Sequence, residues 1–208
     1  FGSTLPVDRK IEYCERVYAQ HGLAPLFRMT PFDRPAELEA ALGTRGYVAF
    51  EETLVQAAAL GQAPELPAAR EDVSIGPLDV EAFVDAVGGL RNSSAAQRDA
   101  HRERLQNSPL DKRCIAVRVG EEVVCTAQAV IEGDLAGLYD VVTAEAARGN
   151  GHATLACTSL LSWAWQHGAQ AAYLQVSADN APALAIYRKL GFATVYAYHY
   201  RGPPGRCE

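Results

Sequence analysis

The most informative stretch of the sequence is Arg148-Gly149-Asn150-Gly151-His152-Ala153-Thr154, which follows an expected strand and opens an expected long helix. Its two glycines let the backbone curl so that successive N–H groups point into one concavity. A helix that begins near Gly151 adds unpaired N–H groups and the positive end of its dipole. Such a turn suits a phosphate or pyrophosphate, with small residues leaving room and the Thr154 hydroxyl as a further donor. The alternative is a tight strand-to-helix turn without a ligand.

Regular elements are expected on both sides of this turn. Apolar periodicity predicts helices over residues 80–87, 95–105, 151–167 and 181–190, with Ser93 or Ser94 as an N-cap. Strands are predicted over 114–119, 123–131, 137–143, 172–176 and 194–200, the first two forming a hairpin around Gly120. A hairpin followed by strand–helix–strand–helix–strand predicts an α/β fold with a mixed, mostly antiparallel sheet and helices on its faces.

The sequence also contains an internal repeat. Tyr18-Ala19-Gln20-His21-Gly22 parallels Ala164-Trp165-Gln166-His167-Gly168, and each is followed by a short apolar run, a helical stretch and a Gly-aromatic pair. Both copies predict helix, glycine stop, strand, helix, glycine stop and strand. The alternative is that an α/β protein shows the same succession of helices, glycines and strands twice by chance. In the first copy Leu42 stands at the position of Tyr187, so this half-repeat is predicted to be degenerate and unable to catalyse.

The repeat suggests a domain organisation. Residues 1–60 are predicted to form the degenerate partial repeat, which has too few elements to close a core alone. Residues 61–71, with two prolines among alanines and acids, are predicted to be a linker. Residues 72–208 are predicted to form the second, complete domain.

Common nucleotide-binding motifs do not fit the glycine turn. It lacks the Lys-Ser/Thr ending of a P-loop and the third glycine of a dinucleotide fingerprint. Two motifs together instead resemble the GNAT superfamily of N-acetyltransferases: Arg148-x-x-Gly151-x-Ala153, and Asn180-x-x-Ala183-x-x-x-Tyr187-x-x-x-Gly191-Phe192. The resemblance covers roughly residues 72–201. It implies a GNAT-like fold, a central mostly antiparallel sheet flanked by helices, with acetyl-CoA as cosubstrate and no metal.

The resemblance also implies which residues bind acetyl-CoA. The glycine turn would bind the pyrophosphate, and the strand before it would pair with the pantetheine arm as with an added strand. Asn180 would fix the loop or the pantetheine region, or cap the helix that follows. His152 would touch a phosphate or face solvent. The predicted residues are Val141, Val142, Thr143, Arg148, Gly149, Asn150, Gly151, His152, Ala153, Thr154 and Asn180.

Acetyl transfer from a thioester to an amine needs a base and an acid. Tyr187 falls where the resemblance places a catalytic tyrosine, and we expect it to protonate the departing thiolate. The alternative is a half-buried aromatic residue that packs against the core. Asp140 is the predicted base, directly or through water, because an alkylamine is mostly charged at pH 7. It could instead bind the ammonium or pair with an arginine.

Composition narrows the class of protein and of partner. The 208 residues are 49% hydrophobic and 21% charged, as in a soluble globular protein, and the net charge of −6 argues against nucleic acid. No run of eighteen apolar residues predicts a membrane span. Five dispersed cysteines are typical of a reducing cytosol, so a cytoplasmic protein is expected. Because the numbering begins with Phe1, an upstream segment is expected to be missing.

The sequence therefore predicts an N-acetyltransferase that moves acetyl from acetyl-CoA to a primary amine by direct attack in a ternary complex. The acceptor is predicted to be a small molecule or a peptide, and a homodimer is left open. One alternative is a non-catalytic acyl-CoA-binding or regulatory module. A less favoured one is a nucleotide-binding protein that uses Gly149 and Gly151 for another diphosphate.

Overall fold

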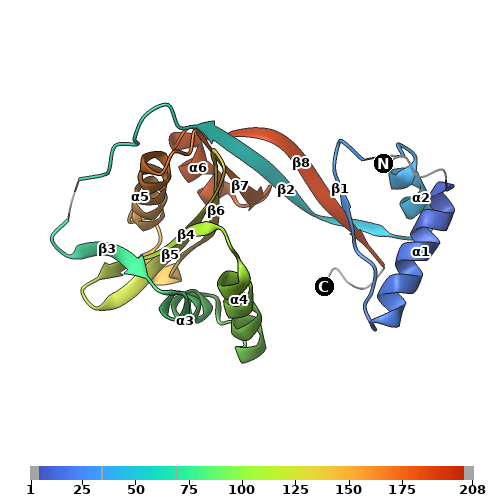
Figure 1. The fold of residues 1–208 in the computed structure, drawn as a ribbon, viewed down its shortest axis with the longest axis horizontal. Coiled ribbons are helices and arrows are strands. Elements are labelled where there is room, and N and C mark those ends of the chain that lie inside the picture. The colour runs from blue at the N-terminus through green and yellow to red at the C-terminus, as the bar shows by residue number, and fades with distance from the viewer. Residues whose placement is uncertain (1–4, 34, 69, 204–208) are drawn as a thin grey trace. The chain divides into compact units, whose positions relative to one another are not determined.

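The computed structural model describes residues 5–33, 35–68 and 70–203, and its elements are labelled in Figure 1. In chain order they are α1 (Val7–Gln20), β1 (Phe27–Met29), α2 (Leu38–Thr44), β2 (Val48–Ala59), β3 (Val73–Leu78), α3 (Val80–Arg91), α4 (Ala95–Asn107), β4 (Asp111–Val119), β5 (Glu122–Glu132), β6 (Leu135–Thr143), the 3-10 helix η1 (Glu145–Ala147), α5 (His152–Gln166), β7 (Ala171–Ser177), α6 (Ala181–Lys189) and β8 (Ala193–Gly202). Within the described residues, no helix is both long and apolar enough to cross a bilayer.

The strands form one open sheet in the order β1-β8-β2-β7-β6-β5-β4-β3. Pairing is antiparallel between β1 and β8 and along β3, β4, β5 and β6, and it is parallel between β6 and β7. This arrangement confirms the predicted α/β fold with a mostly antiparallel sheet flanked by helices. Every helix and strand predicted beyond residue 80 is present, with ends that differ from the prediction by at most four residues.

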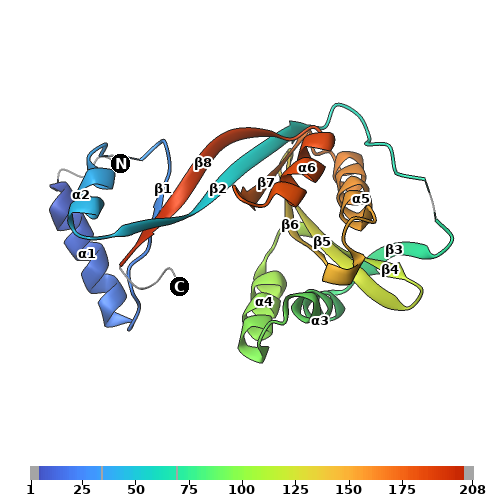
Figure 2. The same cartoon turned by 180° about the vertical axis from the view of Figure 1, so that it is seen from behind.

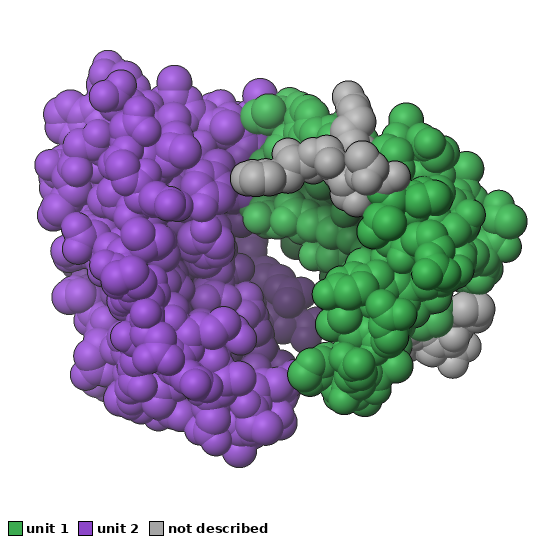
Figure 3. Space-filling model, turned by 45° about the vertical axis from the view of Figure 1, so that its right-hand side comes forward, with its two compact units in different colours: residues 1–55, 175–181, 194–208 green, residues 56–174, 182–193 purple. Residues whose placement is uncertain are grey.

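Contacts divide the chain into two compact units, coloured separately in Figure 3. Unit 1 contains residues 1–55, 175–181 and 194–208, and unit 2 contains residues 56–174 and 182–193. The predicted boundaries at residues 60 and 72 describe a duplicated sequence rather than contacts, and they stay a prediction. Between Ala59 and Val73 the described residues form no helix or strand.

Unit 2 carries helices on both faces of its strands. Figures 1 and 2 show α5 on one side of β4, β5 and β6 and the α3–α4 pair on the other. Accordingly residues 114–117 and 124–129 are buried without interruption, whereas a sheet with one solvated face would alternate. The α3–α4 side of the core is built by Phe83, Val84, Val87, Leu105 and Cys114.

Helix α4 begins as its sequence predicts. The Ser94 side chain accepts a hydrogen bond from the Gln97 N–H, and the Gln97 side chain accepts one from the Ser94 N–H, which forms a capping box. Strand β3 was not predicted, because Gly76 and Pro77 interrupt its sequence pattern. Its place at the end of the sheet explains why it tolerates them, since an edge strand pairs on one side only.

Unit 1 has a small core of its own, formed by Ile11, Met29, Leu42 and Tyr47. Strand β8 lies between β1 and β2, so strands from the two ends of the sequence form the sheet of this unit together.

The two sequence copies end their helices in the same way. Gly22 and Gly168, and likewise Gly46 and Gly191, have positive φ and donate N–H hydrogen bonds to the carbonyl three residues earlier. The residue after each glycine donates to the carbonyl five residues earlier: Leu23 to Tyr18, Ala169 to Ala164, Tyr47 to Leu42 and Phe192 to Tyr187, each at 3.0 Å. Such helix ends are common in unrelated proteins, so duplication stays a prediction.

Candidate active site

Strand β6 carries a bulge at Asp140. Thr126 of β5 faces Val142 and Gln128 faces Tyr139, so Asp140 and Val141 together oppose the one residue between Thr126 and Gln128. Asp140 has φ +50, a left-handed conformation that few residues other than glycine adopt. A bulge of this kind bends the strand and redirects a side chain.

The same strand separates from β7 before it reaches the bulge. The parallel ladder runs from Leu135↔Ala171 to Gly137↔Tyr173 and ends there. The segment from Val141 to Thr143 therefore has β5 on one side and no ladder to β7 on the other. An unpaired edge of this type can accept an extended molecule that carries amides.

The glycine turn has the backbone that the sequence predicts. Gly149 and Gly151 both have φ +81, and Gly151 is the N-cap of α5 with no side-chain hydrogen bond to the helix. The Asn150 side chain donates to the carbonyl oxygens of Ala147 (3.2 Å) and Arg148 (3.3 Å), which holds the turn in shape. Residues 148–151 are exposed. The first N–H groups of α5 are thus left for an external acceptor.

His152 does not face solvent as one of the two predictions supposed. Its side chain is buried, because it follows the N-cap directly and turns inward at the start of α5. The Arg70 guanidinium is the main cause that lowers the pKa of Asp72 below its usual value, and His152 adds a smaller contribution. His152 therefore lies near Asp72. Ala153 and Thr154 are half-buried in the first turn of α5.

Tyr187 lies on α6 with its ring 6.0 Å from that of Phe192 in a T-shaped contact. It is 8% exposed, and its hydroxyl forms no hydrogen bond with the described residues. Burial raises the pKa of this phenol, and nearby Cys157 and Cys125 add to the rise. Cys125 in turn accepts a hydrogen bond from the Thr143 hydroxyl at 3.3 Å. Tyr187 thus stays protonated at neutral pH and lies beside the β5–β6 segment that has lost its β7 partner.

Asp140 contacts one arginine and one histidine side chain. One carboxylate oxygen lies 2.7 Å from Arg91 Nη1 at the end of α3, and the other lies 3.1 Å from His101 Nε2 on α4. Pairing with an arginine was one of the three predicted roles. The sequence did not point to His101, since no motif marks it and its partner lies 39 positions away.

Asn180 directly precedes α6 and is exposed, and its N–H donates to the Ser177 carbonyl at 3.1 Å. It belongs to unit 1, whereas the other predicted site residues belong to unit 2.

No group of His, Cys, Asp or Glu among the described residues is placed to hold a metal ion.

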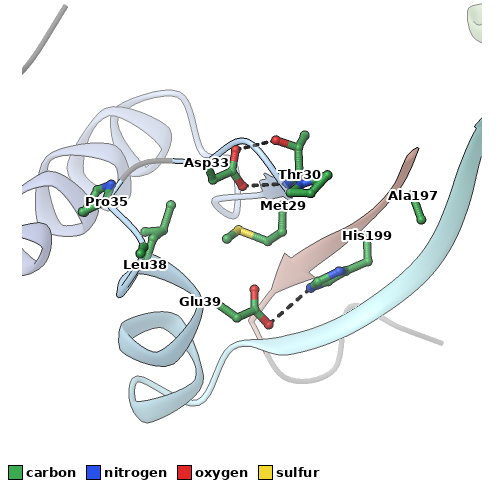
Figure 4. A pocket seen from close by; sticks show the side chains of 10 residues that line it. Met29, Thr30, Asp33, Pro35, Leu38, Glu39, Ala197 and His199 are labelled. Atoms are coloured by element: carbon green, nitrogen blue, oxygen red, sulfur yellow. Dashed lines mark hydrogen bonds and ion pairs between the residues drawn. The ribbon is translucent and has the colours of Figure 1, made fainter. Parts of the chain in front are cut away.

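A pocket of about 360 Å³ lies within unit 1 (Figure 4). Met29, Leu38 and Ala197 give it an apolar lining, and Glu39 and Asp33 are its acidic groups. Arg201 lowers the pKa of Glu39 by donating to it from Nε at 2.8 Å, and His199 Nε2 lies 3.3 Å from the same carboxylate oxygen. Both oxygens of Asp33 accept hydrogen bonds from Thr30. The two carboxylates of this pocket therefore have partners within the protein, whereas the buried His199 Nε2 forms no hydrogen bond with the described residues.

The sequence profile of the Acetyltransferase (GNAT) family matches residues 84–192, just over half of the chain. The chain belongs to the GNAT family. The family resemblance predicted from the sequence is thereby confirmed, and the chain belongs to a family of acetyltransferases that generally uses acetyl-CoA.

Individual relatives agree with this membership. The Bacillus subtilis protein named "Uncharacterized N-acetyltransferase YobR" is 40% identical over 72 residues, which cover 35% of this chain and 29% of that protein. The match thus spans less than a third of the curated relative. The GCN5-related N-acetyltransferase from Kribbella flavida has the same fold with a TM-score of 0.71 at 20% identity, over 96% of this chain and 76% of that one. A tandem GNAT protein from the clavulanic acid biosynthesis pathway gives a TM-score of 0.72 at 13% identity, over 94% and 68%.

Proposed function

We propose that this GNAT protein transfers the acetyl group of acetyl-CoA directly to a primary amine, with both substrates bound together in unit 2. The observation that carries the proposal is the order of three features along β6 and α5. The bulge at Asp140 comes first, the unpaired edge of 141–143 follows, and the glycine turn opens α5. In this order the bulge would receive the acetyl end of the cosubstrate, the unpaired edge would bind its amides, and the glycine turn would bind its phosphates.

The residues present fit coenzyme A. The exposed turn of residues 148–151, with its two left-handed glycines, and the backbone N–H groups of residues 152–154 at the start of α5 would hold the pyrophosphate. The edge of Val141, Val142 and Thr143 would pair with the pantetheine amides. At about 3.3 Å per strand residue, Asp140 lies roughly 10 Å beyond Thr143, which puts the bulge near the thioester end of the arm. Bound acetyl-CoA supplies the activated acetyl group, and the protein supplies position and protons.

Tyr187 is proposed as the acid that protonates the leaving sulfur. Its raised pKa keeps the hydroxyl in the protonated form needed for donation at neutral pH. Its hydroxyl has no protein partner among the described residues, so it is free to hydrogen-bond a ligand. Asn180 stays a predicted contact of the loop or the pantetheine.

The test compares Tyr187→Phe with Tyr47→Phe. Tyr187→Phe removes no protein hydrogen bond, so stability should change by less than about 1 kcal/mol, while thiol release from acetyl-CoA with an amine panel should fall roughly 100-fold or more. Tyr47 donates to Glu15 at 3.0 Å, so Tyr47→Phe should lose about 1 kcal/mol of stability and keep its turnover. Full turnover by Tyr187→Phe would exclude this tyrosine as the acid.

The same assay separates the competing functions. A wild-type protein that binds CoA by calorimetry but releases no thiol with any amine would favour a non-catalytic acyl-CoA-binding module. Stronger thermal stabilisation by ATP or NAD than by CoA would favour a nucleotide-binding protein.

We also propose that residues 1–60 are a degenerate copy of part of the catalytic domain, 72–208, joined by the linker 61–71. The parallel between residues 18–22 and 164–168 in sequence supports this, as does the similarity in fold to a tandem GNAT protein. Leu42, at the position of Tyr187, is fully buried and carries no acidic group, so catalysis would belong to the second copy alone.

A further inference from the structure

We propose that His101 is the catalytic residue that takes the proton from the attacking amine, and that Asp140 is a positioning residue that orients its ring. The inference rests on the proposed direct transfer at the β6 bulge. It reassigns the base from the carboxylate that the sequence suggested to a histidine on α4.

The contacts of Asp140 leave it poorly placed to be the base. One oxygen pairs with Arg91 at 2.7 Å and the other with His101 at 3.1 Å, and the side chain is 16% exposed. A proton placed on either oxygen would weaken one of these contacts. A carboxylate so engaged is suited to fix a neighbouring ring, as in other carboxylate–histidine pairs.

His101 has one nitrogen left for the reaction. Nε2 lies 3.1 Å from the Asp140 carboxylate, which favours the tautomer that carries its hydrogen on Nε2 and its lone pair on Nδ1. Nδ1 has no hydrogen-bond partner among the described residues. The ring packs edge-on against Phe83 at 6.2 Å, and the side chain is 13% exposed, so the imidazole is held firmly while remaining reachable.

The bulge explains why these groups meet. Asp140 adopts a left-handed φ of +50, a conformation that is uncommon outside glycine and that often marks functional sites. It directs the carboxylate to α3 and α4, while the next residue, Val141, begins the edge proposed for pantetheine. The His101–Asp140 pair therefore lies at the end of the cosubstrate site where the amine must attack.

Other charged side chains on α3 and α4 have partners of their own. On the α3–α4 surface Arg102 pairs with Glu81, Asp85 and Asp99. Arg98 donates to the Ser93 carbonyl. Burial is the main cause that raises the pKa of Cys114 to about 12, with Asp140 adding to it, so this thiol stays neutral. Asp140 is the charged group in contact with His101 among the described residues, and Arg91 lies on the other oxygen of that carboxylate.

The proposed step balances as follows. The amine nitrogen forms a bond to the acetyl carbon and the carbon–sulfur bond breaks. A bound ammonium first gives one proton to His101 Nδ1, which passes it to solvent. After the neutral amine has attacked, its second proton goes to the same nitrogen, and the sulfur leaves with the proton of Tyr187. Solvent then returns a proton to Tyr187 and takes one from His101.

The experiment measures kcat/KM against pH for His101→Gln, Asp140→Asn and the control His167→Gln. Glutamine can still donate to Asp140 but cannot accept the proton. His167 Nδ1 contacts the Trp163 carbonyl at 2.8 Å, at the opposite end of α5 from the glycine turn. We expect His101→Gln to lose about 100-fold or more at neutral pH and to regain activity as the pH rises and the amine deprotonates itself. His167→Gln should match the wild type.

Asp140→Asn should lower kcat but keep part of the activity, because His101 can still accept the proton while its ring is less well oriented. Added imidazole should restore part of the activity of His101→Ala and none of that of Asp140→Asn. The proposal is overturned if His101→Gln keeps the wild-type profile, or if Asp140→Asn alone abolishes the acid limb. Failure of the proposed function is distinct, because the wild type itself would then show no turnover.

Discussion

Replacing Gly88 by alanine tests how α3 and α4 are held together. Gly88 is buried on α3, and a Cβ there would lie 2.6 Å from Arg98 Nε and 2.9 Å from its Cγ and Cδ. Arg98 would have to move away from the Ser93 carbonyl that it contacts at 3.2 Å. Gly89, the next residue, has no atom within 4 Å of its Cβ position and is the matched control.

The expected magnitudes have opposite signs. Alanine is better than glycine within a helix by about 1 kcal/mol, and Gly89→Ala should gain up to that amount. Gly88→Ala has the same gain, but overpacking costs about 1–3 kcal/mol and loss of the arginine contact adds to it. The two variants should therefore differ by about 2 kcal/mol, or roughly 4–8 °C in Tm for a chain of this size.

Urea and thermal unfolding of both variants measure this difference, and kcat/KM gives a second readout. Because α3 carries Arg91 and α4 carries His101, Gly88→Ala should also lower activity, whereas Gly89→Ala should not. Equal Tm values for the two variants would refute the reasoning, since the steric contact would then have no energetic consequence.

Two further predictions concern the glycine turn and the pocket of unit 1. A Cβ on Gly151 would meet no atom within 4 Å, so the cost of Gly151→Ala comes from the left-handed φ of +81 alone and is about 1–2 kcal/mol. Calorimetry should show that this variant binds CoA at least tenfold more weakly. The control Gly61→Ala, at a position without a positive φ, should leave CoA binding unchanged. The lowered pKa of Glu39 means that its ionised form stabilises the fold above about pH 4.3 and that this contribution is lost as the pH falls through the folded pKa. The Tm advantage of the wild type over Glu39→Gln should thus be present at pH 7 and shrink as the pH falls below about 4.3, and an advantage that does not change with pH would contradict this.

Local patterns account for most of what the sequence predicted. The glycine turn, the Ser94 capping box and the glycine helix stops are each determined by residues within a few positions of one another, and all appear in the structure. Strand β3 was missed for the same reason, because Gly76 and Pro77 obscure its pattern and only its pairing with β4 makes it a strand.

Contacts between distant residues could not be predicted in this way. The bulge at Asp140 depends on a register shift between two strands, and its partners Arg91 and His101 come from two helices that precede it by 49 and 39 positions. Nothing in the local sequence distinguishes an aspartate that points to solvent from one whose carboxylate contacts an arginine and a histidine. The hydrogen bond from the Thr143 hydroxyl to Cys125 is likewise not predictable from sequence periodicity.

The position of β8 between β1 and β2 has a consequence for synthesis of the chain. β1 pairs with residues 199–201, more than 160 positions later in the sequence. On the ribosome, the nascent α1–β1–α2 segment must wait until almost every other residue has been translated before its sheet can close. Pairing over so long a separation makes folding slow. During this delay the unpaired edges of the segment are open to wrong partners, which makes it a natural client for chaperones.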